Sequence, residues 1–291
     1  MAALVLGSAQ DGGVPHAGCD CRRCLAALEE PGARRLPACL GLADFAAGTH
    51  WLVDATPALP RQWGRLRGVA PGTTLGGILL THLHMGHYTG LVHLGPEAAN
   101  TTGMPVYATP GAWSFLESNA PWRELIAGGH LARRTLTLGR RFPLSPDLGA
   151  TAFRVPHRGD HGDTVAYLFD GPKRRLFWCP DVDGWQEWDR GLRAFLTGHR
   201  VDIALVDGTF SEAAELPGRS MADVPHPLAA DTAARVAGLD CEVGLVHLNH
   251  TNRLLDDGEA RAFLAAQGVT VAREGDCWNL ASPPDRGGLA S

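Results

Sequence analysis

The 291-residue sequence lacks a long basic run, and this argues against nucleic acids as partners. Its formal net charge is −5, and its basic residues cluster only in separated pairs and one triplet. Nucleic-acid-binding domains gather lysine and arginine on one face, because phosphate contacts supply most of their affinity. We therefore expect no nucleic-acid partner.

Long apolar runs are also missing. No segment approaches the roughly 20 apolar residues of a membrane span, and the short apolar stretch 1–8 lacks the positive leader of a signal peptide. We expect a cytoplasmic protein with no membrane partner. The seven cysteines would then serve metal binding, packing or catalysis rather than disulfides.

No internal repeat, low-complexity tract or linker divides the chain, so residues 1–291 are predicted to form one domain. The apolar fraction of 45% is sufficient for a large core. Strand-like runs alternate with helical patterns, which is typical of the α/β class. The helical patterns cover roughly 111–127, 185–197, 227–238 and 257–267.

Six strand-like runs end in ionisable residues. These residues are Asp54, His82 with His84, His157, Asp181, Asp207 and His247. A single aspartate after a strand is usually a turn or a helix cap. Six such ends would converge if they lie on one edge of a sheet framework, where open α/β sheets hold ligands. The pattern predicts a shared functional rim.

Residues 81–87 read THLHMGH and place three imidazoles directly after the apolar run 77–80. His82 and His84 are two residues apart, so in an extended segment their side chains point the same way. His87 follows just before a helix-like run. Imidazole is the commonest protein ligand for zinc, iron and similar ions, so the cluster predicts a metal site. Chance clustering is the alternative, since the chain has 13 histidines.

This stretch resembles the HxHxDH signature of the metallo-β-lactamase superfamily. Within it the chain is similar to the coenzyme PQQ synthesis protein B family through VLGSAQDGGVPHAGCDCRRC, GMPVYATPGAWSFLESNAPW, VPHRGDHGDTVAYLF, VDGTF and VHLNHTNRLLD. It also resembles the cyclic-phosphate phosphodiesterase of phosphonate breakdown, which shares the CxCxxC start. The resemblance implies an αββα sandwich, in which helices flank two mixed β-sheets and a cleft at one edge holds the metal site.

The resemblance also implies two adjacent metal positions that share a carboxylate. The first would use His82, His84 and His157, the second His87 and His247, and Asp181 would bridge them. Where the superfamily signature has aspartate, this chain has Gly86. The protein B family usually lacks the first two histidines of the signature and keeps the Asp-His end. This chain keeps both histidines and lacks the aspartate. Because this carboxylate is missing, we expect tight metal binding at the first position and weak or no metal binding at the second.

The implied reaction is metal-assisted hydrolysis. A metal-bound hydroxide would attack a phosphoryl or acyl centre of a small-molecule or peptide-derived substrate, and the active site would hold one or two Zn, Mn or Fe ions. Asp181 is a candidate catalytic residue. His161 and Asp163, with Asp160, are candidates for proton transfer or ligand support, and a polar loop is the alternative.

Two other functions fit the same residues. The ligand types also suit Fe(II) and oxygen, so one alternative is an iron-dependent oxygenase in the biosynthesis of pyrroloquinoline quinone or a related cofactor. The other is a non-catalytic carrier in which Gly86 marks a decayed site. Relatives in this family are often dimers, which makes a homodimer one expectation for the assembly.

A second metal site is predicted from Cys19, Cys21 and Cys24, which form C-x-C-x-x-C. Three thiolates this close favour a structural Zn, which takes four ligands; a redox pair or a buried cluster is the alternative. The resemblance to the phosphodiesterase assigns His250 as the fourth ligand. His226, in the stretch VPHP, is expected in a loop that borders the cleft.

Overall fold

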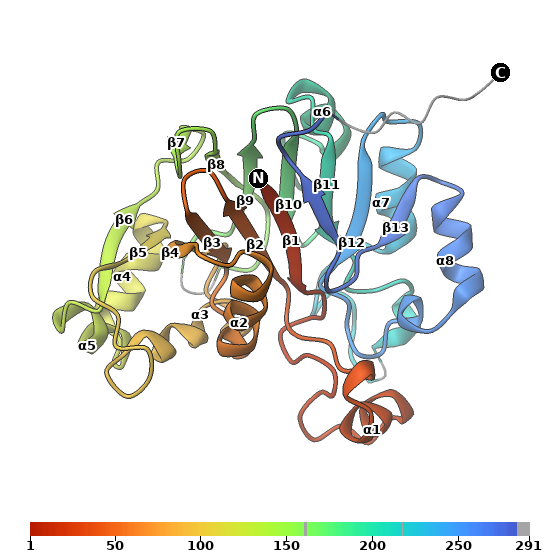
Figure 1. Ribbon diagram of the computed structural model, residues 1–291. Helices are drawn as coiled ribbons and strands as arrows, with labels where there is room; N and C mark the ends of the chain where they lie inside the picture. Colours follow the sequence, from red (N-terminus) through yellow and green to blue (C-terminus); the bar gives the residue numbers. More distant parts are fainter. Residues whose placement is uncertain (160–161, 217, 284–291) are drawn as a thin grey trace.

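The computed structural model describes residues 1–159, 162–216 and 218–283, and in this part of the chain two seven-stranded sheets lie face to face (Figure 1). In spatial order, the first sheet consists of β14 (Cys277–Asn279), β1 (Ala2–Gly7), β2 (Cys39–Asp44), β3 (Thr49–Val53), β4 (Thr74–Leu79), β5 (Met104–Ala108) and β6 (Leu131–Thr135). The second consists of β13 (Val269–Val271), β12 (Glu242–Val246), β11 (Ile203–Asp207), β10 (Arg175–Cys179), β9 (Val165–Asp170), β8 (Gly149–Arg154) and β7 (Phe142–Pro143).

Helices cover the outer face of each sheet (Figure 1). The first sheet carries α2 (Leu59–Val69), α3 (Met85–Tyr88), α4 (Pro110–Ser118) and α5 (Trp122–Ala127), with the 3₁₀ helix η2 (Thr89–Leu94). The second carries α6 (Leu192–Gly198), α7 (Ala229–Val236) and α8 (Gly258–Ala265). The remaining helices are α1 (Arg22–Glu29) and the 3₁₀ helices η1 (Pro31–Ala33), η3 (Ala213–Glu215) and η4 (Arg253–Leu255). The predicted αββα sandwich is confirmed.

The central strands are apolar on both faces because both faces are buried. In β11, Ile203 and Leu205 join the core between the sheets, whereas Ala204 and Val206 pack under the helices of the second sheet. This alternation follows the two-residue period of a strand. It explains why the sequence shows continuous apolar runs rather than alternating ones.

Two of the four predicted helices differ from the structure. The pattern 111–127 forms α4 and α5, which are separated by Asn119 in an extended conformation and by Pro121 at the start of α5. In 185–197 only the second part is helical, because Gly191 adopts a left-handed φ of +63°. The first part instead buries Trp185 and Trp188 against the core.

The other two helical predictions are confirmed, since 227–238 contains α7 and 257–267 contains α8. No helix of the described residues combines the length and apolar character needed to cross a membrane.

The directions of the strands determine where the predicted rim lies. In the first sheet β3 and β4 are parallel neighbours, and β1 runs the same way because two antiparallel steps separate it from β3. In the second sheet β10, β11 and β12 are parallel, and β8 matches them through antiparallel β9. The carboxyl ends of these strands therefore lie at a common edge within each sheet.

Candidate metal centre

Four of the predicted ligands converge. His82 and His84 follow β4, His157 follows β8 and Asp181 follows β10, and one ligand atom of each lies within 4.8 Å of the others. His157 Nε2 lies 3.1 Å from His84 Nδ1 and 3.6 Å from Asp181 Oδ1. The structure thus brings the residues of the expected first position together with the expected bridging carboxylate.

A second group shares Asp181. His87 Nε2 lies 3.3 Å from Asp181 Oδ2, and His247 Nε2 lies 3.3 Å from Asp181 Oδ1. Asp11 completes this group, with Oδ1 at 3.1 Å from both imidazole nitrogens. Asp11 was not predicted as a ligand from the sequence. Its one signal was its position shortly after the first strand-like run, where the other rim residues also follow strands.

A buried carboxylate that directly follows β3 orients two of the rings. Asp54 Oδ2 accepts hydrogen bonds from His87 Nδ1 at 2.8 Å and from the Thr81 hydroxyl at 2.9 Å. Because the Thr81 hydroxyl donates to Asp54, its oxygen can accept from His82 Nδ1, which lies 2.9 Å away. Both rings therefore direct Nε2 toward the centre, as is usual for metal-binding histidines.

The second sheet repeats this arrangement. The Thr209 hydroxyl donates to Asp207 Oδ1 at 2.8 Å and can accept from His247 Nδ1, also at 2.8 Å. Asp207 Oδ2 accepts from His226 Nδ1 at 2.6 Å. His157 is oriented separately, since Nδ1 lies 2.8 Å from an Asp183 carboxylate oxygen.

The backbone at two of these strand ends is strained. Asp54 has a φ of +73° and His247 a φ of +63°, in the left-handed region that residues other than glycine seldom occupy. Such conformations cost about 1–3 kcal/mol each and cluster at functional sites. Here they turn the orienting carboxylate and one ligand toward the shared edge.

Two buried atoms of the centre have no hydrogen-bond partner among the described residues, His82 Nε2 and Asp181 Oδ2. An unsatisfied buried polar atom costs about 1–3 kcal/mol. The orientation of His82 leaves its Nε2 as an acceptor, and a carboxylate oxygen is also an acceptor. A divalent cation would satisfy both atoms, so the residues fit a metal ion.

The charge states of the rings in the metal-free protein differ between the two positions. Burial and the nearby His87 lower the pKa of His82 well below its usual value, and burial and His157 lower the pKa of His84 to about 4. These two rings are neutral at pH 7, the form that binds metals. Burial also disfavours a charge on His87, but Asp54, Asp181 and then Asp11 outweigh it and raise the pKa of His87 well above its usual value.

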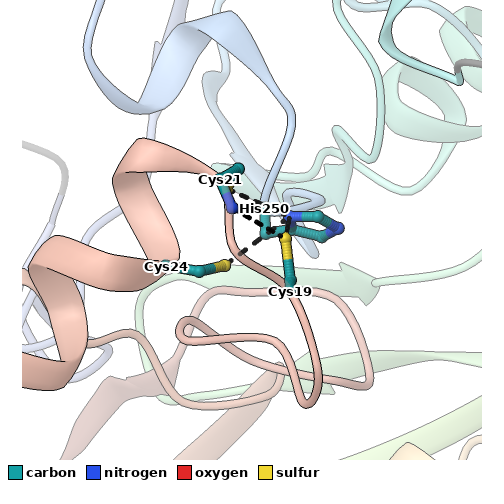
Figure 2. A group of neighbouring side chains, drawn as sticks. All are labelled: Cys19, Cys21, Cys24 and His250. Carbon is teal, nitrogen blue, oxygen red and sulfur yellow. Dashed lines mark hydrogen bonds between the residues drawn. The ribbon is translucent and has the colours of Figure 1, made fainter.

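The predicted structural zinc ligands also come together (Figure 2). His250 Nδ1 lies 3.6, 3.8 and 3.7 Å from the Sγ atoms of Cys19, Cys21 and Cys24, respectively. Tetrahedral Zn with bonds of about 2.3 Å to sulfur and 2.0 Å to nitrogen separates these ligand atoms by about 3.6 Å. The four residues therefore fit a zinc ion.

Of the three residues predicted for proton transfer or ligand support, only Asp163 lies among the described residues. His161 and Asp160 lie outside the described residues. Asp163 forms an ion pair with Arg154 at 2.7 Å, and within the described part of the chain it belongs neither to the metal-ligand groups nor to the wall of the cleft. The structure thus does not bring Asp163 to the ligands.

A cleft of about 350 Å³ opens over the centre. Its wall includes His84, Asp181 and His247 from the centre, and His226 as expected for the VPHP loop. The same wall includes His250, so the cysteine site and the histidine cluster border one cleft.

Residues 49–265 match the family described as the β-lactamase superfamily domain. The chain belongs to the β-lactamase superfamily. Coenzyme PQQ synthesis protein B of Methylobacterium radiotolerans is 29% identical over 306 residues, which cover 94% of this chain and 98% of that protein. The protein of the same name from Azotobacter vinelandii is 28% identical, with 93% and 97% covered.

Two solved structures share the fold. Zn²⁺-bound PqqB from Methylobacterium extorquens has a TM-score of 0.81 and 25% identity, and the match covers 96% of this chain and 100% of that one. A diphosphatase from the PhnP family has a TM-score of 0.66 and 20% identity, with 95% and 96% covered. The predicted metallo-β-lactamase fold and the resemblance to coenzyme PQQ synthesis protein B are confirmed.

Proposed function

We propose that the protein is a metal-dependent hydrolase that cleaves a phosphate ester of a small molecule. The observation that carries this proposal is the convergence of His82, His84, His157 and Asp181 beside a cleft that His84 and Asp181 line. Two buried acceptor atoms of this group are unsatisfied among the described residues. A divalent ion bound there would lower the pKa of a coordinated water to about 7 and polarise a substrate oxygen.

The cleft wall favours a phosphoryl over an acyl substrate. Arg158 and Arg219 both line it, and guanidinium groups bind phosphate oxygens in bidentate fashion. Arg158 is held in place by donating to the Asp223 carbonyl at 2.8 Å. These two residues would bind the substrate's anionic group and orient it over the ligands.

His226 can supply a proton to the leaving group. It lines the cleft and is fixed through Nδ1 by Asp207, which leaves Nε2 for the substrate. Burial disfavours its charge, but Asp207 outweighs burial and raises the pKa of His226 above its usual value. A ring that holds its proton near neutral pH can act as a general acid.

A second candidate is an iron-dependent oxygenase in the biosynthesis of pyrroloquinoline quinone or a related cofactor. It is favoured by relatives named coenzyme PQQ synthesis protein B, which match 94% of the chain. Three imidazoles and one carboxylate also suit Fe(II). Oxygen consumption by the Fe(II)-loaded protein would distinguish this candidate from the hydrolase.

The test is hydrolysis of bis(p-nitrophenyl) phosphate by protein loaded with Zn²⁺ or Mn²⁺. We expect metal-dependent turnover that falls at least about 100-fold in His84→Ala, because the substitution removes a ligand. His93→Ala, in η2 and outside the ligand groups of the described residues, is the matched control and keeps wild-type turnover. Equal turnover with and without metal would refute the hydrolase. Absence of both turnover and oxygen consumption would favour a carrier.

A further inference from the structure

Gly86 lies against the side chain of Asp11. A Cβ atom added at Gly86 would lie 2.4 Å from Asp11 Cγ and 2.6 Å from Asp11 Cα and Cβ. Contacts this short do not occur in folded proteins, and the Asp11 backbone is part of the obstacle. Asp11 therefore occupies the space that a side chain at position 86 would need.

The Asp11 carboxylate is also placed as a ligand. Its Oδ1 lies 3.1 Å from His87 Nε2 and 3.1 Å from His247 Nε2. Ligand atoms about 2.1 Å from a common ion lie about 3.0–3.4 Å apart in octahedral or tetrahedral geometry. Both separations lie in this range, as do the 3.3 Å separations from the same two nitrogens to Asp181.

The backbone fixes Asp11 relative to His247. The Gln10 N–H donates to the Leu248 carbonyl at 2.9 Å, which ties the loop after β1 to the residue that follows His247. The Gly13 N–H donates to the Gln10 carbonyl at 2.7 Å and closes a turn around Asp11. The carboxylate is thus held in place by main-chain hydrogen bonds that do not involve its own oxygens.

We propose that Asp11 is the carboxylate ligand of the second metal position, in place of the aspartate that the superfamily signature carries at position 86. The carboxylate has moved from the helix start after β4 to the loop after β1, and Gly86 provides the space for it. The second position then has Asp11, His87, His247 and the shared Asp181, so the centre binds two ions. The inference rests on the proposed function only in treating the histidine cluster as a metal centre.

Zinc content per chain, with Zn²⁺ titration after chelation and reloading, tests this assignment without an activity measurement. Wild type should bind three ions: one at the cysteine site and two at the centre. Asp11→Ala and the near-isosteric Asp11→Asn should each lower the affinity of one centre ion by at least about 10-fold. The retained cysteine-site zinc and an unchanged circular dichroism spectrum report that each variant is folded.

Electron paramagnetic resonance of the Mn²⁺-loaded protein gives a second readout. Wild type should give the spin-coupled signal of paired Mn²⁺ ions, and Asp11→Ala and Asp11→Asn should not, because one of the two positions has lost a ligand.

The outcomes separate the two proposals. Asp11→Ala with three ions at wild-type affinity, or with the spin-coupled signal of wild type, overturns the ligand role of Asp11. Loss of both centre ions from Asp11→Ala, with the cysteine-site zinc retained, would make Asp11 a structural support and also overturn its assignment to one position. The proposed function fails instead if His82→Ala with His84→Ala still binds all three ions.

Discussion

Two threonines decide which nitrogen of two ligands faces the metal centre. Thr81 connects Asp54 to His82, and Thr209 connects Asp207 to His247. In each case the hydroxyl donates its single proton to a carboxylate and so can only accept from the imidazole. The arrangement fixes a ring orientation that the imidazole alone would not have.

Removing one hydroxyl should therefore weaken one metal position. Thr81→Val preserves shape but leaves His82 Nδ1 without its acceptor, so we expect about 10–100-fold lower affinity at the first position. Thr209→Val should do the same at the second. Zn²⁺ titration measures both. Thr81→Ser and Thr209→Ser keep the hydroxyl and serve as controls; equal losses in the serine and valine variants would contradict the hydroxyl's role.

Proton release should distinguish the two positions. At pH 7 His82 and His84 are neutral, since their pKa values are lowered, whereas the raised pKa of His87 leaves its ring protonated in the metal-free centre. Metal must displace that proton. Affinity at the second position should therefore rise with pH until His87 is deprotonated, whereas His82 and His84 have no proton to lose at the first position.

The measurement is titration calorimetry at pH 7 in two buffers of different ionisation enthalpy, on protein that already holds zinc at its cysteine site. The ion bound at the second position should release the His87 proton, whereas the ion at the first position finds His82 and His84 already neutral. Heats that do not depend on the buffer at either position would contradict the predicted charge of His87.

At the scale of elements, the cysteine site joins α1 to the loop that carries a centre ligand. α1 buries only Cys24 and Ala27, too little apolar surface to hold an eight-residue helix in place. Among the described residues its other ties include Arg23, which donates to the His250 carbonyl and pairs with Asp256 at 2.8 Å. Arg34 also donates to the Ala27 and Leu28 carbonyls. Zinc would thus hold both α1 and the loop between His247 and His250.

Cys24→Ser should remove one zinc ion per chain and loosen that loop. We expect faster hydrogen exchange in residues 16–29 and 247–252, and a weaker second metal position because His247 lies at the start of the loop. Cys277→Ser, which changes an exposed thiol outside the site, should have no such effect. Unchanged exchange in Cys24→Ser would show that α1 is held without zinc.

Across the whole molecule, the centre connects the two sheets. Asp11, His82, His84 and His87 follow strands of the first sheet, and His157, Asp181 and His247 follow strands of the second. An ion bound between them cross-links the two halves of the sandwich. Metal binding at this edge should therefore be coupled to global stability.

Chelation should lower the melting temperature of the protein. One ion at 100 times its dissociation constant adds about 2.7 kcal/mol, which is about 4 °C for a chain of 291 residues. The measurement is calorimetric melting with and without chelator. Comparing wild type with the double variant His82→Ala and His84→Ala gives the contribution of the first metal position. Chelation should lower the melting temperature of the variant less than that of wild type. Equal decreases would show that an ion at the first position adds no stability.

Local patterns were sufficient to predict the six strands that lead to the rim residues, although the described part of the chain has further strands that were not predicted. The six strand ends converge as expected because apolar runs identify buried strands and parallel strands share an edge. The helix over 185–197 was partly wrong, since Gly191 turns the chain and the preceding tryptophans pack instead. That competition between burial and helix formation depends on tertiary contacts, which the local sequence does not show.

The ligand that was missed is separated from its partners by long stretches of chain. Asp11 meets His87 across 76 positions and His247 across 236. Gly86 looked like the loss of a ligand because its neighbour in space is not its neighbour in sequence. His250, 231 positions from Cys19, was predictable only through the resemblance to a known family.

Anomalous diffraction at the zinc edge, from crystals of zinc-loaded protein, tests the metal centre most directly. We expect one peak between His82, His84, His157 and Asp181, a second between Asp11, His87 and His247, and a third at the cysteine site. A peak at the cysteine site alone, with none among the histidines, would contradict the central claim that the rim of the sandwich is a metal centre.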